Sequence, residues 1–495
     1  MWRSLLLVAL IPLAACTTLS NTARSYLTAP SGLQLDDDRL RLLLRRGMAD
    51  SALRAVGNRK SPMSPDDRLL RLLYQGTAAR YAGHYREAGA FFDEAFAVSE
   101  DRFTKSVSRT AAALVTNDYA LPYTAGHNER LLLHYNALLA WSAAGDADAA
   151  AVEARRLVAL LARVGTPATD ERPMRAMLHS LAAAAFDAAG DRADADVARR
   201  NAIALGAPLD STWVPPADSL GDVVVVVERG DVAHKVAVGL TVPIFDADAS
   251  ASGGAAQRLL ADFGAMRNGG LWWDDTPSWR LSDTRYAPLR GARASYLLDM
   301  SWPVLRRSSS ARMGPIEVMA GRVRVGTLDG ASLSDALAAD YRRDRGAILT
   351  RTVSRAVAKY LASRAVEAVV ESASGDNDGD KKKKKEKEGD SDAGRRAAGM
   401  VARLVTNAAT TALERADTRG WTLLPSQVAL VHMRIPAGTH DLVVDAAGMR
   451  QLNVGNVVVR AGRTTIVSGR VWRESVEGFR AVVERSATDQ PTPQR

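Results

Sequence analysis

The spacing of hydrophobic residues divides this chain into a helical N-terminal half and a β-rich remainder. Over residues 36–206, alanine and leucine recur at helical spacing, proline is sparse, and glycines separate the apolar stretches. This pattern predicts a helical domain over residues 36–206. The prolines that follow mark residues 207–221 as a linker.

The strongest repeat signal lies around Leu72–Ala95. Its spacings match the second half of a tetratricopeptide (TPR) repeat, which pairs two helices in about 34 residues. Small residues would let the helices approach closely, and aromatic residues would fill the space between hairpins. The residues that carry this spacing are Gly76, Gly83, Tyr85, Ala88, Phe92 and Ala95. Weaker turns at Gly47, Gly145 and Gly190 indicate a degenerate or interrupted array. The concave face of such an array favours a partner-binding role over that of a spacer.

Residues 222–374 predict a β-rich domain that ends in a helix. The continuous β-branched run Asp222–Glu228 fits a strand buried on both faces. After a turn, Val232–Phe245 alternates well enough to pair with that strand. Further strands are expected at Ser295–Trp302 and Ile316–Leu328. From residue 332 the pattern becomes a basic amphipathic helix, for which packing within the domain is favoured over lying on a membrane.

A highly charged segment follows this helix, and regularly spaced strands come after it. Residues 375–394 contain no apolar side chain except Ala393, so this insert is predicted to be disordered. A helix over 395–420 would complete a helical hairpin. Residues 421–473 resemble the small β-sandwich modules of envelope proteins, and 474–495 form a tail. The four strands expected in the module are 428–435, 440–444, 452–459 and 464–472. The predicted fold is therefore multidomain α + β: a TPR-like α-solenoid, a β-rich middle domain with a helical hairpin, and a C-terminal β-sandwich module.

The N-terminus combines a short apolar run with the single cysteine of the chain. Leu13, Ala14, Ala15 and Cys16 follow a short apolar run that is too short to span a membrane. They resemble the lipobox of bacterial lipoproteins. This resemblance implies a signal peptide over 1–15, diacylglycerol and an N-acyl chain on Cys16, and a tether over 16–35. Thr17 in place of aspartate implies sorting to the outer membrane of a Gram-negative bacterium, facing the periplasm. The alternative is a conventional signal peptide with a chance cysteine.

Composition excludes several kinds of chemistry and leaves two functions open. Cys16 is the single cysteine, which excludes intramolecular disulfides and thiolate zinc sites. The net charge of +9 reflects either an arginine-rich composition or attraction to anionic lipid or peptidoglycan, while export argues against nucleic acid. No hydrolase, zinc-protease or phosphate-loop motif occurs, so no catalytic residue, metal ligand or cofactor is expected. Trp272, Trp273 and Trp279 would either stack a glycan or peptide or cap a small core.

Beyond the lipobox, the layout resembles an uncharacterised family of bacterial TPR-containing outer-membrane lipoproteins. The resemblance rests on the segments Tyr81–Ala88, Glu153–Arg156, which reads as a solvated helix face, and Asp417–Trp421. It implies work alongside other envelope proteins and transfers no activity. The leading hypothesis is a non-enzymatic interaction scaffold that binds a periplasmic or outer-membrane protein. The alternative is a peptidoglycan- or glycan-binding envelope protein with possible hydrolytic activity.

Overall fold

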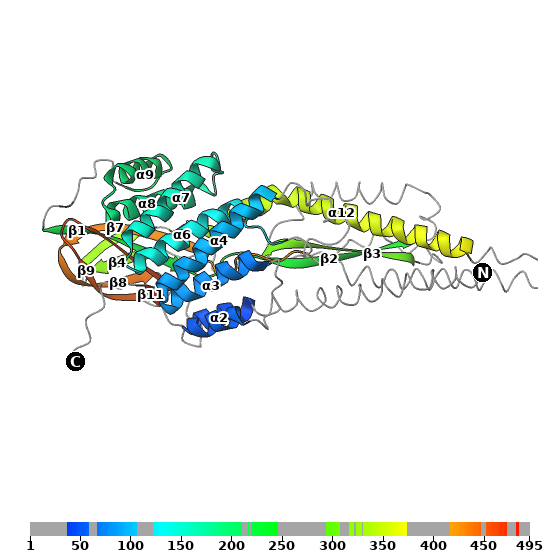
Figure 1. Cartoon of the computed structure of the whole chain (residues 1–495), viewed down its shortest axis with the longest axis horizontal. Helices are drawn as coiled ribbons and strands as arrows, with labels where there is room; N and C mark the ends of the chain where they lie inside the picture. Colours follow the sequence, from blue (N-terminus) through cyan, green and yellow to red (C-terminus); the bar gives the residue numbers. More distant parts are fainter. Residues whose placement is uncertain are drawn as a thin grey trace, which may run out of the picture.

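The chain folds into a mixed α and β structure (Figure 1). The computed structural model describes residues 37–58, 67–105, 122–209, 216, 219–245, 294–306, 316–320, 323–328, 330–373, 416–446, 452–472 and 482–484. The predicted signal peptide, tether, charged insert and most of the tail lie outside these residues. Within them, helices fill the N-terminal half and strands dominate the C-terminal half, as predicted.

The N-terminal helices form one layer in which successive helices pack against each other. Residues 37–45 are helical. The helices that follow are α2 (Ala49–Gly57), α3 (Arg68–Ala82), α4 (Tyr85–Lys105), α6 (His127–Ala143), α7 (Ala147–Arg163), α8 (Arg172–Ala189) and α9 (Arg192–Ala204). Gly83 ends α3 with a φ of 84°, a left-handed conformation that glycine adopts without strain. Gly190 ends α8 in the same way.

A five-stranded sheet lies against the helical layer. Its strand order is β11-β10-β1-β7-β6, with β1 (Leu220–Arg229) in the centre. Strand β1 runs parallel to β10 (Thr464–Val471) and antiparallel to β7 (Gln427–Pro436). The short strands β6 (Ala331–Ser332) and β11 (Val482–Glu484) form the edges. The central strand therefore comes from a segment more than 190 residues before its two neighbours.

A four-stranded sheet covers the other face of the five-stranded sheet. Its order is β5-β4-β8-β9, from β5 (Val323–Leu328), β4 (Ile316–Ala320), β8 (Gly438–Ala446) and β9 (Leu452–Val459). Side chains of both sheets share one apolar core, whereas the helices share a second core with the opposite face of β1. The body thus has three layers: helices, five-stranded sheet and four-stranded sheet.

The alternation of β1 between the two cores confirms that this strand is buried on both faces. Val223, Val225 and Val227 belong to the core between the sheets, and Val224 and Val226 to the core beneath the helices. Each of these valines is at most 3% exposed. The continuous valine run is needed because neither face of the strand meets water.

Two expectations about the strands were wrong. The segment Val232–Phe245 does not pair with β1, because β7 and β10 already occupy both edges of β1. Residues 222–374 and 421–473 also do not form separate β units: β1 lies in one sheet with β7 and β10, and β4 pairs with β8. The expected strand 316–328 is a hairpin of two strands, β4 and β5.

An arm extends from this body (Figure 1). We define it as the antiparallel pair β2 (His234–Phe245) and β3 (Ala294–Arg306) together with α12 (Leu333–Ala373). With 41 residues, α12 is about 60 Å long. It contacts β3, and the hydroxyl of Tyr341 donates a hydrogen bond to the carbonyl of Pro303 over 2.7 Å. Of the predicted helix 395–420, only 416–420 are described, and these residues are not helical. Among the described helices, none combines the length and apolar content of a membrane span.

Candidate functional site

A fully buried charge cluster joins the helices to the five-stranded sheet. Glu228 on β1 accepts two hydrogen bonds from Arg80 on α3, at 2.7 and 2.8 Å. Its carboxylate also accepts the hydroxyls of Tyr81 and Tyr135, at 2.6 and 2.8 Å. Burial alone would raise the pKa of Glu228, but Arg80, Arg470 and these hydrogen bonds hold that pKa below its ordinary value. Glu228 is therefore held as an anion between the two layers.

Arg470 on β10 extends this cluster to two further backbone segments. Its guanidinium donates to the carbonyls of Leu423, at 2.5 Å, and Gly230, at 2.8 Å. It lies 4.9 Å from the ring of Trp472, at cation–π distance. With partners on several sides, Arg470 fixes the course of the chain after β1 and before β7. The cluster thus has the contacts of a structural joint.

The segment that precedes β7 lies in the inner face of the helical layer. Arg419 forms ion pairs with Asp67 and Asp417, each at 2.8 Å. The hydroxyl of Tyr74 donates to the carbonyl of Gly420 over 2.9 Å. Trp421 donates from its indole nitrogen to Thr77 over 2.9 Å, and from its backbone nitrogen to Glu129 over 3.0 Å. The helices therefore hold residues 417–421 through ion pairs and hydrogen bonds.

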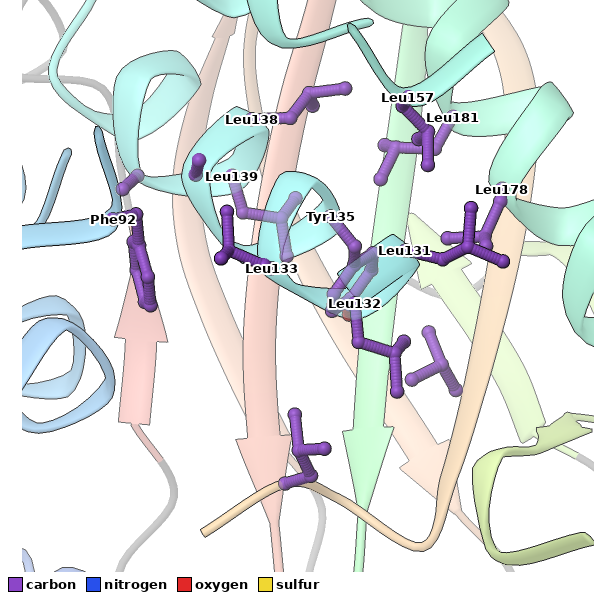
Figure 2. Packing of buried hydrophobic residues seen from close by; sticks show 14 of the residues in the cluster. Phe92, Leu131, Leu132, Leu133, Tyr135, Leu138, Leu139, Leu157, Leu178 and Leu181 are labelled. Atoms are coloured by element: carbon purple, nitrogen blue, oxygen red, sulfur yellow. The ribbon is translucent and has the colours of Figure 1, made fainter. Parts of the chain in front are cut away.

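The residues expected to pack a TPR repeat lie around this segment. A Cβ on Gly76 would meet the ring of Phe92 at 2.6 Å, so the glycine permits the close approach of α3 and α4. Phe92 in turn lies 6.0 Å from Trp421, between ring centroids. Ala88 and Ala95 are fully buried, Tyr85 is half-buried, and Gly83 forms the turn. Figure 2 shows Phe92 beside the buried leucines of α6, with strands of the sheet behind them.

These contacts show which face of the helical layer is covered by the chain itself. The inner face of the helices packs on β1, β7 and β10, and residues 417–421 fill the space near Phe92. In this structure the array therefore uses that face for its own chain. These contacts leave the outer helix surfaces and the arm uncovered.

A cavity of about 260 Å³ lies where the arm meets the body. We call it the junction cavity. The start of α6, the body ends of β2 and β3, the first turns of α12 and residues 420–422 line it. Its titratable lining includes His127, His234, Lys235, Glu129 and Asp340. It is the place where groups from distant segments of the sequence converge around open space.

Burial perturbs the titration of several groups in this cavity. It raises the pKa of Asp340 to about 7, although the backbone amide of Asn128 and the nearby Arg343 act in the opposite direction. Burial, with Arg41 nearby, lowers the pKa of His234 to about 4. Burial, together with Arg343 and Arg130, also lowers the pKa of His127. Near neutral pH, Asp340 is therefore poised between its neutral and ionised forms.

The carboxylates of the junction cavity have defined partners. Asp340 accepts the backbone amide of Asn128 over 2.7 Å at the start of α6, which ties α12 to α6. Glu129 accepts the amide of Gly126 over 3.0 Å and the hydroxyl of Tyr123 over 2.6 Å, in addition to Trp421. These oxygens hold the elements together.

Other candidates from the sequence have different outcomes. Leu13, Ala14, Ala15 and Cys16 lie outside the described residues, as do Trp272, Trp273 and Trp279. The segment 153–156 is not a purely solvated face, because Glu153 is 2% exposed and pairs with the buried His134 over 2.7 Å. Among the residues that the structure describes, no group of three or more His, Cys, Asp or Glu side chains could hold a metal ion.

Comparison of the chain with protein-family models, curated proteins and solved structures finds no match. Sequence reasoning missed Arg80, Glu228 and Arg470 as a joint. No local signal marks them, because each lies at helical or strand spacing among ordinary neighbours. Trp421 did lie in a segment that the sequence singled out.

Proposed function

We propose that this protein is a lipid-anchored interaction scaffold of the Gram-negative cell envelope, with a TPR-type helical array as its structural platform. Acyl chains on Cys16 would hold it at the periplasmic face of the outer membrane. The lipobox-like order of Leu13, Ala14, Ala15 and Cys16 supports this anchor. More than one acyl chain would make the attachment stable, because a single chain binds a bilayer only reversibly.

One feature of the arm carries the proposal of a partner. The exposed side of α12 presents an uncharged stripe at positions three or four residues apart, over about four helical turns. Its members are Ala347, Thr350, Ser354, Ala358 and Leu361. Leu361 is 57% exposed, the highest value among the exposed large hydrophobic side chains of the described residues. An exposed helix face normally carries charged residues, so this stripe favours contact with another protein.

The packing of the body also favours the arm as the surface that binds a partner. The inner face of the helices is occupied by the sheet and by residues 417–421. The arm extends away from these layers, where a partner can reach it (Figure 1). The helical array then stabilises the base of the arm, through the hydrogen bond from Asn128 at the start of α6 to Asp340 on α12, while the exposed side of α12 contacts the partner.

Crosslinking and pulldown from envelope extract test this proposal. The test variant is Ala358→Glu with Leu361→Glu, which places two charges in the stripe. The matched control is Val152→Glu with Val197→Glu, at exposed positions of α7 and α9 that are 43% and 44% exposed. We expect the wild type and the control to recover the same discrete partner and the arm variant to lose it. Recovery of that partner by the arm variant, or its loss only in the control, would contradict the assignment to the arm.

A further inference from the structure

A second cavity, of about 230 Å³, lies beside the start of β10, on the opposite side of β1 from β7. We call it the notch. Its helical side is formed by the turn between α6 and α7 and by the end of α8, and small residues there leave the space open. These residues are Gly145, Ala147, Ala150 and Ala188. The connection between β9 and β10 forms its other side.

Two arginines stand at the strand side of the notch. Arg460 and Arg463 flank the turn between β9 and β10, and both side chains are exposed. The amide of Gly462 donates to the carbonyl of Leu220 over 2.8 Å, and that of Arg463 to the carbonyl of Arg460 over 3.2 Å. The turn is thus fixed to the start of β1. Within the described part of the chain, neither guanidinium has an ion pair.

The carboxylates that adjoin the notch are engaged elsewhere. Asp222, the register partner of Thr464, pairs with Arg434 over 2.8 Å. Asp146 caps α7 by accepting the amide of Ala149 over 3.1 Å. Asp187, next to Ala188, pairs with Arg199 over 2.6 Å. None of these acids is among the residues that line the notch, so its charged lining is basic.

Hydroxyl groups complete the polar lining. Thr464 and Thr465 are half-buried on β10. Ser142 at the end of α6 has a hydroxyl oxygen that is buried and has no hydrogen-bond partner in the structure. A buried polar atom of this kind normally has a partner. Arginine forks and the hydroxyl groups of Thr464 and Thr465 suit a tetrahedral oxyanion.

We propose that the notch binds the phosphate group of a small phosphoester, with Arg460 and Arg463 as its ion-pair partners. Its volume corresponds to several water molecules at about 30 Å³ each, and lies below the range of about 300 Å³ or more that is usual for drug-sized ligands. A phosphate with a few attached carbon atoms fits this space. Such a group occurs in free phosphomonoesters and in phospholipid headgroups. The site is independent of the arm and of any partner there.

Isothermal titration calorimetry with the purified full-length protein tests the site. The probes are inorganic phosphate, glycerol 3-phosphate and a short-chain phosphatidylglycerol below its micelle concentration. Binding of glycerol 3-phosphate but not of the diester would indicate a free phosphomonoester, and the reverse would indicate a lipid headgroup. We expect Arg460→Ala and Arg463→Ala each to weaken binding by about tenfold or more. Absence of binding for all three probes would overturn the proposal.

Two further variants separate a built site from general charge attraction. Ala147→Leu fills the notch and leaves both arginines in place, so it should also abolish binding. Arg192→Ala with Arg200→Ala removes two exposed arginines of α9 and should leave binding unchanged. Equal weakening in this control, or full binding by Ala147→Leu, would show that the phosphate does not occupy the notch.

Discussion

Removal of the charge of Glu228 should lower the free energy of unfolding far more than the loss of a surface ion pair does. Glu228→Gln keeps the shape of the side chain but removes the buried anion with which Arg80 pairs, while Arg470 keeps its ion pair with Asp231 over 3.3 Å. Glu228 and Arg80 are completely buried, and Arg470 is 1% exposed. Breaking a buried ion pair by removing one partner costs about 3–5 kcal/mol. We therefore expect the free energy of unfolding of Glu228→Gln to fall by about this amount.

The contacts of Glu228 indicate that the cost lies near the upper end of that range. Its two oxygens accept four hydrogen bonds, two from Arg80 and one each from Tyr81 and Tyr135. A glutamine amide has one oxygen to accept hydrogen bonds, so some of these donors lose their acceptor. A buried donor without an acceptor costs about 1–3 kcal/mol.

Urea unfolding followed by tryptophan fluorescence provides the measurement, because Trp472 packs edge-on against Tyr81 with ring centroids 6.3 Å apart. The matched control is Glu94→Gln, which removes the exposed partner of Arg68. This control should cost less than about 1 kcal/mol. If the free energy of unfolding of Glu228→Gln were within about 1 kcal/mol of the wild-type value, the cluster would not be the joint between helices and sheet.

Three further changes have defined outcomes. In the same urea assay, Gly76→Ala should destabilise the protein by about 1–3 kcal/mol, because its Cβ would meet the ring of Phe92 at 2.6 Å. A Cβ at Gly346 would have no atom within 4 Å, so Gly346→Ala should be neutral or stabilising by up to about 1 kcal/mol. Because burial raises the pKa of Asp340 to about 7, its contribution to stability is complete below about pH 4 and is lost as the pH rises through 7. Between pH 5 and pH 8 the wild type should therefore lose about 2–3 kcal/mol more than Asp340→Asn, and equal pH profiles would refute this. Cys16→Ser should move the protein from the membrane to the soluble fraction of the envelope, and a variant that stays membrane-bound would place the anchor elsewhere.

Local sequence patterns identify most of the elements in the described residues. The expected strands 428–435 and 452–459 correspond closely to β7 and β9. The valine run of β1 indicated burial on both faces, and the structure confirms it. These features depend on side-chain periodicity and on turn residues, which act over a few positions in the chain.

Pairing between distant segments was not predictable in the same way. Periodicity shows that β1 needs two covered faces, but it does not identify the neighbours. The parallel partner of β1 is β10, which joins residues such as Asp222 and Thr464. The pattern therefore suggested the next segment, β2, whose actual partner is β3.

The candidate sites depend on the same long-range contacts. Glu228 follows a run of valines, and a charged residue at such a position normally indicates that the strand ends in solvent. Its burial depends on Arg80 and Tyr135, which come from helices earlier in the chain. Likewise, the junction cavity and the notch each combine segments more than 200 residues apart. No motif in one segment could therefore predict either cavity.

Photo-crosslinking in intact cells is the most direct test of the proposed scaffold function. A benzophenone amino acid is placed at Ala358 or Leu361 on the arm, and at Val152 or Val197 on the array as matched exposed positions. We predict discrete adducts of higher mass from both arm positions and none from the array positions. Adducts from the array positions alone, or from none of the four, would contradict a scaffold that binds its partner through α12.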